Sequence, residues 1–549
     1  MTAAQDGFRA LVDEVFDATL RFSPGTATAR GFHQYDDRLT DASAEAVRRR
    51  TAELRDHLAR AEALDAAALP PEEARDLRLL RSQLRYQLRD LEELRPFARS
   101  PMTYLGIVSG ACDSLVRRSF APAPERLRSL IARERLVPEL LAQGRAGVEP
   151  DLCTTIHAET ALEQLAGLRL LFTEDLPRFA AEAGDAAARR DFEDANAGVL
   201  AALDGYGAWI RETLLPRAAG QIALGRERFE ILLRDADMIT LPAEELVRRA
   251  REDLSRTQAL LRETAERIQP GAPVAEVVDR VSAEHPTADD LIPESEACLE
   301  DLRRFCVEQG LVTMPTDEPI RVEETPGYYR YLAQAACSTP GPFEARATEA
   351  FYWVTRPAPD WDAERREGYL RFFNRYAIPL IGGHEVYPGH YVHLTWLRKA
   401  DSRVGRFFPN TTTIEGWAHY CEQVLIEAGY GGGDPRYHLM QLREALLRLC
   451  RYLAAFGLHT EGWSFQDAVE FFVREGYATR VIAEREARRG VLSPSYYAYT
   501  LGKHEILALR ERLRTRLGSR FNLQAFHNRV MQLPYPVPII ADVLSSEAA

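Results

Sequence analysis

Residues 384–397 read HEVYPGHYVHLTWL, and residues 411–429 read TTTIEGWAHYCEQVLIEAG. Both stretches combine a helical apolar pattern with histidines and carboxylates, the side chains that bind zinc in enzymes. The adjacent pair His384 and Glu385 opens the first stretch. A helix can direct such a histidine at a metal ion and place the next carboxylate beside the open coordination position. Together, these two stretches predict a helical protein with a zinc-dependent hydrolytic site.

The spacing of the second histidine departs from the usual HExxH pattern. His390 follows His384 by six residues, which on a regular helix would place it about 240° around the axis. Pro388 lacks an N–H, and its ring clashes with the carbonyl four residues earlier, that of His384. With Gly389 beside it, we expect the helix to bulge or unwind here and His390 to reach the metal. Tyr391 shares the His384 face of an unbroken helix but is a poor zinc ligand.

The second stretch offers the third protein ligand that a catalytic zinc site needs. Glu415 lies 25 residues beyond His390 and opens a second helical pattern. His419 and Glu422 follow at i+4 and i+7, so all three side chains share one helical face. We predict Glu415 as the ligand and Glu422 as a carboxylate that orients a ligand histidine. His419 is the alternative ligand on that face.

Outside these stretches the chain is organised mainly as amphipathic helices, with apolar residues three and four apart. Residues 312–358 differ, because Pro, Gly and Thr accumulate there around two strand-like runs, IRVEE (320–324) and AFYWV (350–354). We therefore predict a mainly α fold with a small β-sheet near the active-site helix. Residues 1–310 are expected to form one wall of the cleft and residues 311–549 the catalytic region, within one continuous structural unit. We predict AFYWVT (350–355) as an edge strand that aligns an extended peptide.

The composition limits the classes of partner. The net charge of −13, with acidic and basic residues interleaved along helical patterns, argues against nucleic acid and against an anionic membrane. The sequence contains no run of about 18 uncharged apolar residues, so we predict no membrane span. The first residues do not resemble a secretory signal. The seven scattered cysteines are typical of reduced, buried thiols, so we expect a cytoplasmic protein. The sequence does not indicate the oligomeric state.

HEVYPGH and EGWAHYCE resemble the HExxPGH and EGWAxYxE motifs of the domain-of-unknown-function family 885, which is grouped with zincin metallopeptidases. The resemblance covers most of the chain. SPGTATARGFHQYDDRLTDAS (23–43), GLHTEGWSFQDAVEFF (457–472) and YAYTLGKHEI (497–506) are similar to further elements of that family. The Glu-Gly-aromatic helix that follows the second histidine also looks like that of angiotensin-converting-enzyme-type dipeptidases.

The resemblance implies a gluzincin-like fold with one zinc ion per chain. Its metal ligands would be His384, His390 and Glu415, and Glu385 would be the general base. The resemblance further implies that His459 and Tyr499 reach the substrate.

Three positions depart from the family pattern. They are Tyr391 in place of a second consecutive histidine, Val392-His393 in place of Leu-Gln, and Ala455 in place of an acidic residue. His393 itself is predicted to be a packing or surface residue. We expect these three departures to alter the choice of substrate and the affinity for the metal more than the fold.

The predicted function is zinc-dependent hydrolysis of a peptide or amide bond. Two alternatives remain at this stage: a specialised biosynthetic amide or ester hydrolase on the same scaffold, and a non-catalytic helical binding protein. Tyr499 is interpreted as a hydrogen-bond donor to the oxyanion that forms when water attacks the substrate carbonyl. The alternative is that Tyr499 belongs to an aromatic cluster in the core. His459 is either a second donor or a helix-end histidine. Arg448 and Arg451 either clamp a substrate carboxylate or are solvated or structural arginines, and the second interpretation is favoured.

Overall fold

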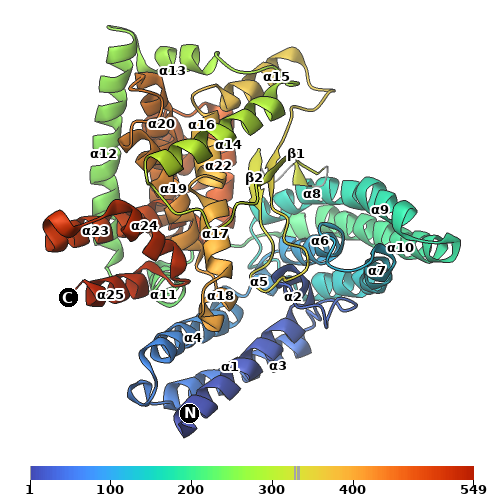
Figure 1. Cartoon of the computed structure of the whole chain (residues 1–549). Coiled ribbons are helices and arrows are strands. Elements are labelled where there is room, and N and C mark those ends of the chain that lie inside the picture. Colours follow the sequence, from blue (N-terminus) through green and yellow to red (C-terminus); the bar gives the residue numbers. More distant parts are fainter. Residues whose placement is uncertain (1, 327–328, 331–333, 549) are drawn as a thin grey trace.

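Helical periodicity in the sequence is realised along most of the chain (Figure 1). The computed structural model describes residues 2–326, 329–330 and 334–548. The predicted mainly α fold with a small sheet is confirmed. None of the helices within these ranges combines the length and the apolar character needed to cross a bilayer.

The N-terminal helices form an arm at the bottom of Figure 1. Helix α1 begins after a capping box in which Thr2 and Gln5 satisfy each other's backbone N–H groups. Its buried side chains recur three and four residues apart, as at Phe8, Leu11 and Val15, and this apolar stripe packs against the body of the protein. The helices of the arm are α1 (Ala3–Phe22), α2 (Pro24–Arg30), α3 (Ala44–Ala63) and α4 (Pro71–Arg89).

The next helices form a bundle at the right of Figure 1 with a core of its own, which includes Leu105, Leu130 and Leu203. A π-helical turn, η2 (Asp90–Leu94), connects α4 to this bundle. The bundle consists of α5 (Pro96–Arg99), α6 (Met102–Val116), α7 (Ala123–Gly147), α8 (Thr155–Leu170), α9 (Leu176–Ala183) and α10 (Ala186–Trp209).

The remaining helices build the body in which the predicted site lies. Long α12 packs along α20, and α19 packs along α23. Their bounds are α11 (Arg226–Ala236), α12 (Ala243–Ile268), α13 (Val274–Ser282), α14 (Leu291–Glu308), α15 (Ala363–Leu370), α16 (Ile378–Glu385), α17 (His390–Arg398), α18 (Arg403–Phe407), α19 (Thr411–Glu427), α20 (Pro435–Thr460), α21 (Phe465–Gly476), α22 (Arg480–Leu492), α23 (Ala498–Leu517), α24 (Leu523–Gln532) and α25 (Val537–Glu547). A short 3₁₀ helix, η8 (Pro494–Tyr497), precedes α23.

The sheet contains the two predicted strands, β1 (Arg321–Glu324) and β3 (Phe351–Val354), and a third, β2 (Ala335–Ser338). The strand order is β1-β3-β2, with β1 parallel and β2 antiparallel to β3. The prediction that AFYWVT is an edge strand is therefore wrong, because both sides of β3 are paired. Strand β2 was not predicted, since its sequence AACS lacks the alternation and the aromatic or β-branched residues that mark a strand.

Two hydrophobic clusters join residues from both sides of position 310. One contains Phe8 and Leu80 together with Phe407 and Ile540. The other contains residues of α12, such as Leu261, together with residues of α20 and α23. The helices that carry the predicted site are thus packed directly against N-terminal helices.

Candidate metal centre

The predicted interruption of the first motif helix is present between Glu385 and His390. Helix α16 ends at Glu385 and α17 begins at His390, and the Tyr387–Pro388 peptide bond is cis. A Cβ at Gly389 would lie 1.8 Å from the carbonyl oxygen of His384, so only glycine fits where the chain folds back. The interruption brings the rings of His384 and His390 together, with centroids 4.8 Å apart.

The three predicted ligands converge. One ligand atom from each of His384, His390 and Glu415 lies within 4.8 Å of the others. Glu415 Oε2 is 3.6 Å from His384 Nε2 and 3.5 Å from His390 Nε2. These separations are long for hydrogen bonds, and Glu415 Oε2 is buried without a hydrogen-bond partner among the described residues. Two ligands of a tetrahedral zinc, each about 2.0–2.1 Å from it, lie roughly 3.4 Å apart, so the donor set fits zinc.

Glu422 anchors one of these ligands from behind. Its Oε1 is 2.8 Å from His384 Nδ1, which leaves Nε2 of that ring to face Glu415. Arg448 Nη2 lies 3.1 Å from the same Oε1, and His419 Nδ1 lies 3.3 Å from Oε2. Burial alone would raise the pKa of Glu422, but Arg448, His419 and His384 hold it well below its usual range. The carboxylate is therefore charged, as the orientation of a ligand histidine requires.

The electrostatics of the centre favour positive charge between the carboxylates. Burial alone would lower the pKa of His384, but Glu415 and Glu422 raise it to about 9. The pKa of Glu415 is lowered despite its burial, because the two histidines face it. A bound dication would complement the same carboxylates.

Glu385 lies beside this centre and is fixed by the sheet. Its Oε2 accepts a hydrogen bond of 2.9 Å from the backbone N–H of Cys337 in β2. The strand therefore holds one carboxylate oxygen, and the other has no hydrogen-bond partner among the described residues. This contact could not be predicted from the sequence, because it joins a backbone group and a side chain 48 residues apart.

Tyr499 reaches the centre because α19 and α23 cross in backbone contact. A Cβ at Gly502 would lie 2.7 Å from the Cα of Gly416, so each helix presents glycine at the crossing. One turn earlier on α23, the ring of Tyr499 stacks beside that of His384, with centroids 6.4 Å apart. Burial and then Glu415 raise the pKa of Tyr499, so its hydroxyl remains a proton donor at neutral pH. No described residue forms a hydrogen bond with that hydroxyl.

Comparison with known proteins agrees with the motifs. The chain matches the family described as "Bacterial protein of unknown function (DUF885)" over residues 24–543. The chain belongs to the DUF885 family. A "putative lipoprotein of unknown function" from Shewanella oneidensis has a similar structure, with a TM-score of 0.82 and 25% identity over 99% of this chain and 100% of its own. A "putative lipoprotein" from Colwellia psychrerythraea has a TM-score of 0.84 with 15% identity, and each chain is fully covered. Among the curated proteins, none matches.

His459 of this DUF885 protein does not take the predicted position of a substrate donor. Its Nδ1 lies 3.1 Å from the carbonyl oxygen of Ile222 and its Nε2 lies 2.9 Å from that of Gly490. Both ring nitrogens thus face backbone carbonyls, and because burial lowers the pKa of the imidazole, the neutral ring donates its one N–H to one of them. His459 therefore lies near the end of α20, apart from the three predicted ligands, and it lines the larger of the two hollows described below.

Other candidates in the DUF885 chain also have structural partners. Arg448 pairs with Glu422 and Glu444, and Arg451 pairs with Glu486 through contacts of 2.6 and 3.1 Å, so neither is a free clamp for a carboxylate. His419 faces Glu422 and is not part of the converging set.

The three departures from the family pattern are packed residues. Tyr391 donates a hydrogen bond to the carbonyl of Glu318. His393 is fully buried, so the prediction of a packing residue is confirmed. Ala455 is buried in the core between α12 and α20.

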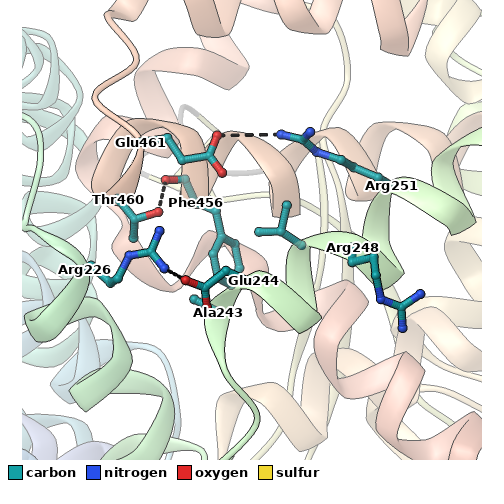
Figure 2. A pocket seen from close by; sticks show the side chains of 9 residues that line it. Arg226, Ala243, Glu244, Arg248, Arg251, Phe456, Thr460 and Glu461 are labelled. Atoms are coloured by element: carbon teal, nitrogen blue, oxygen red, sulfur yellow. Dashed lines mark hydrogen bonds and ion pairs between the residues drawn. The ribbon is translucent and has the colours of Figure 1, made fainter.

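Two hollows lie apart from the ligand set. The smaller, of about 280 Å³, is shown in Figure 2. Its charged side chains are already paired, Arg226 with Glu244 and Arg251 with Glu461. The larger, of about 520 Å³, lies between the N-terminal helices and the start of α19. None of the three ligands lines either hollow.

Proposed function

We propose that the protein is a zinc-dependent hydrolase of peptide or amide bonds, related to the zincin metallopeptidases. The observation that carries the proposal is the convergence of His384, His390 and Glu415 beside the anchored carboxylate of Glu385. The two histidines and Glu415 would hold the zinc. When bound, zinc supplies Lewis-acid activation of water and of a carbonyl group.

In this proposal Glu385 acts as general base and then as general acid. The N–H of Cys337 holds Oε2, so Oε1 accepts the proton of the attacking water. The same carboxyl group then delivers that proton to the leaving amine nitrogen. Tyr499 donates its hydroxyl proton in a hydrogen bond to the oxygen on which negative charge develops.

The outer edge of β2 is the proposed guide for an extended substrate. The N–H of Cys337 points away from β3, toward Glu385. In an antiparallel pair the N–H and C=O of one residue point to the same side, and every second residue repeats this direction. The N–H and C=O of Ala335 and the C=O of Cys337 therefore face the edge beside the site and would pair with the substrate, in the role that the sequence had suggested for β3.

Metal analysis and kinetics of the Glu385→Gln variant test this proposal. The purified protein is expected to contain about one zinc per chain, and His384→Ala, His390→Ala and Glu415→Ala are expected to lose most of it. Glu385→Gln is expected to keep the metal and the melting temperature but to lose about 10²- to 10⁴-fold in turnover. A variant that hydrolysed substrate at the parent rate would refute the role of Glu385.

A panel of short peptides, non-peptidic amides and esters, assayed by mass spectrometry, separates a peptidase from a specialised biosynthetic hydrolase. Absence of both metal and turnover would favour a binding protein that has kept the fold.

We also propose a cytoplasmic location, on the basis of the cysteine usage. The description of the two similar structures as lipoproteins is the reason to test it. Cell fractionation with detection of the native protein distinguishes a cytoplasmic protein from one attached to a membrane. Recovery in the membrane fraction would overturn this part of the proposal.

A further inference from the structure

The larger hollow has the size of a ligand site. Its volume of about 520 Å³ lies within the range of about 300–1,000 Å³ that is typical of small-molecule sites. Segments far apart in the sequence line it, from α4 and α8 to α19, α20 and η8. Thr411 and Thr412 in its wall belong to the turn of α19 that precedes Glu415.

The lining of this cavity includes an unpaired carboxylate. Asp90 lines it one helical turn beyond Tyr86. The carboxylate of Asp90 has no hydrogen-bond or ion-pair partner among the described residues, and burial raises its pKa to about 6. Asp237 also lines the cavity, but its oxygens already accept hydrogen bonds from Asn410 and from the Tyr497 hydroxyl. Asp90 is therefore the carboxylate that a ligand cation would meet.

The lining also includes a cation. Arg99 lines the cavity and donates a hydrogen bond of 3.2 Å to the carbonyl of Gln221, but no carboxylate of the described chain pairs with it. Burial lowers its pKa, and nearby Arg228 adds to this effect. His157 also lines the cavity, and burial together with nearby Arg99 lowers its pKa to about 4. Asp90 and Arg99 form no ion pair with each other, so each keeps its charge for a ligand.

Apolar side chains form much of the remaining wall, among them Leu94, Ile222, Leu224, Leu232 and Leu492. A ligand that matches all three parts has an ammonium group for Asp90, a carboxylate for Arg99 and an apolar body for these side chains. We propose that this cavity is a second binding site, separate from the three predicted metal ligands, for a small zwitterion such as a dipeptide with apolar side chains.

Binding of L-leucyl-L-leucine, measured by isothermal titration calorimetry, tests the proposal. Glu385→Gln is the background, because this substitution is intended to keep the dipeptide intact. Asp90→Asn and Arg99→Gln are each expected to weaken binding about tenfold or more, since hydrogen bonds to charged groups are among the strong ones. Arg251→Gln, in the smaller hollow of Figure 2, is the matched control and is expected to leave binding unchanged.

Modified dipeptides keep the test independent of variants that fold poorly. N-acetyl-leucyl-leucine lacks the ammonium group and leucyl-leucinamide lacks the carboxylate, so each is expected to bind the parent more weakly. The acetylated form is expected to be insensitive to Asp90→Asn, and the amide to Arg99→Gln.

Two results would overturn the assignment: no binding of the dipeptide at 10 mM, or binding that both substitutions leave unchanged. Loss of binding in His384→Ala alone would place the dipeptide at the metal centre instead. Zinc content and hydrolysis are measured separately, so the hydrolase proposal stands or fails independently of this site.

Discussion

Replacement of Gly502 by alanine tests whether the crossing of α19 and α23 positions the metal centre. A Cβ at residue 502 would lie 1.9 Å from the carbonyl oxygen of Thr412 and 2.7 Å from the Cα of Gly416. Ordinary van der Waals contact begins near 3.4 Å, so the two helices would have to separate by about 1.5 Å. The atoms that block the methyl group are backbone atoms, which no side-chain rotation can move aside.

The separation is large compared with the tolerance of a zinc site. Glu415 follows Thr412 by one turn on α19, and Tyr499 precedes Gly502 by one turn on α23. Ligand distances in zinc sites vary by only about 0.2 Å, so even a fifth of the shift would disturb Glu415. We expect zinc affinity to fall at least tenfold and the free energy of unfolding to fall by about 1–3 kcal/mol, the usual range for overpacking.

Zinc retained after dialysis against a chelator, together with the melting temperature, measures both effects. Gly198→Ala is the matched control, because it lies exposed on α10 with no atom near the added methyl group. That control is expected to keep its zinc and to gain up to about 1 kcal/mol of stability. If Gly502→Ala retained zinc with parent affinity and turned over substrate normally, the close crossing would not be what positions Glu415.

Three further predictions concern single side chains. Glu422→Gln removes the charge that holds His384 Nδ1, so zinc affinity in a chelator competition should fall about 10- to 100-fold; unchanged affinity would contradict the anchoring role. Tyr499→Phe should lower kcat about 10²- to 10³-fold while zinc content and melting temperature stay near the parent values, whereas normal kcat would return this ring to the core. Burial raises the pKa of Glu134 to about 9, and neither of its oxygens has a partner among the described residues. The folded state therefore retains a proton that the unfolded state releases, and stability falls as pH rises from about 4.5 to 9. Raised to about 9, this pKa lowers the free energy of unfolding by roughly 3 kcal/mol at pH 7. Urea unfolding at pH 5 and pH 8.5 should show that Glu134→Gln removes most of this loss and that exposed Glu139→Gln does not. If the free energy of unfolding changed equally with pH in both variants, Glu134 would not be the group responsible.

Local patterns in the sequence predicted much of the fold. Apolar spacing indicated helices along most of the chain, and α12 is an example, because the buried side chains of a helix recur at regular intervals in its own sequence. Two of the three strands were also predicted, and the family was identified correctly. The helix interruption at Pro388 followed from the missing N–H and the steric demands of the ring, and the structure shows it where it was expected.

The errors concern relations between distant segments. The sequence of β3 does not indicate whether the strand is paired on one side or on both. Its central place in the sheet was therefore not predictable. His459 resembled a donor, but carbonyl groups of two distant residues, Ile222 and Gly490, engage its ring. The hydrogen bond from Cys337 to Glu385 depends on a backbone group, which the sequence does not distinguish from any other.

The hydrophobic cluster that joins the two ends of the chain has a consequence for synthesis on the ribosome. Phe16 in α1 stacks on Phe407 with ring centroids 3.7 Å apart, and the same cluster includes Ile540. The bundle α6–α10 draws nearly all of its core from residues 104–214, so it can form while the chain is still emerging. The arm is translated first, and α1 can pack on α3 at once, but Phe16 lacks its partner Phe407 until residues beyond 400 have been added. Nascent chains stalled before that point are therefore expected to be the species that chaperones bind and proteases cut.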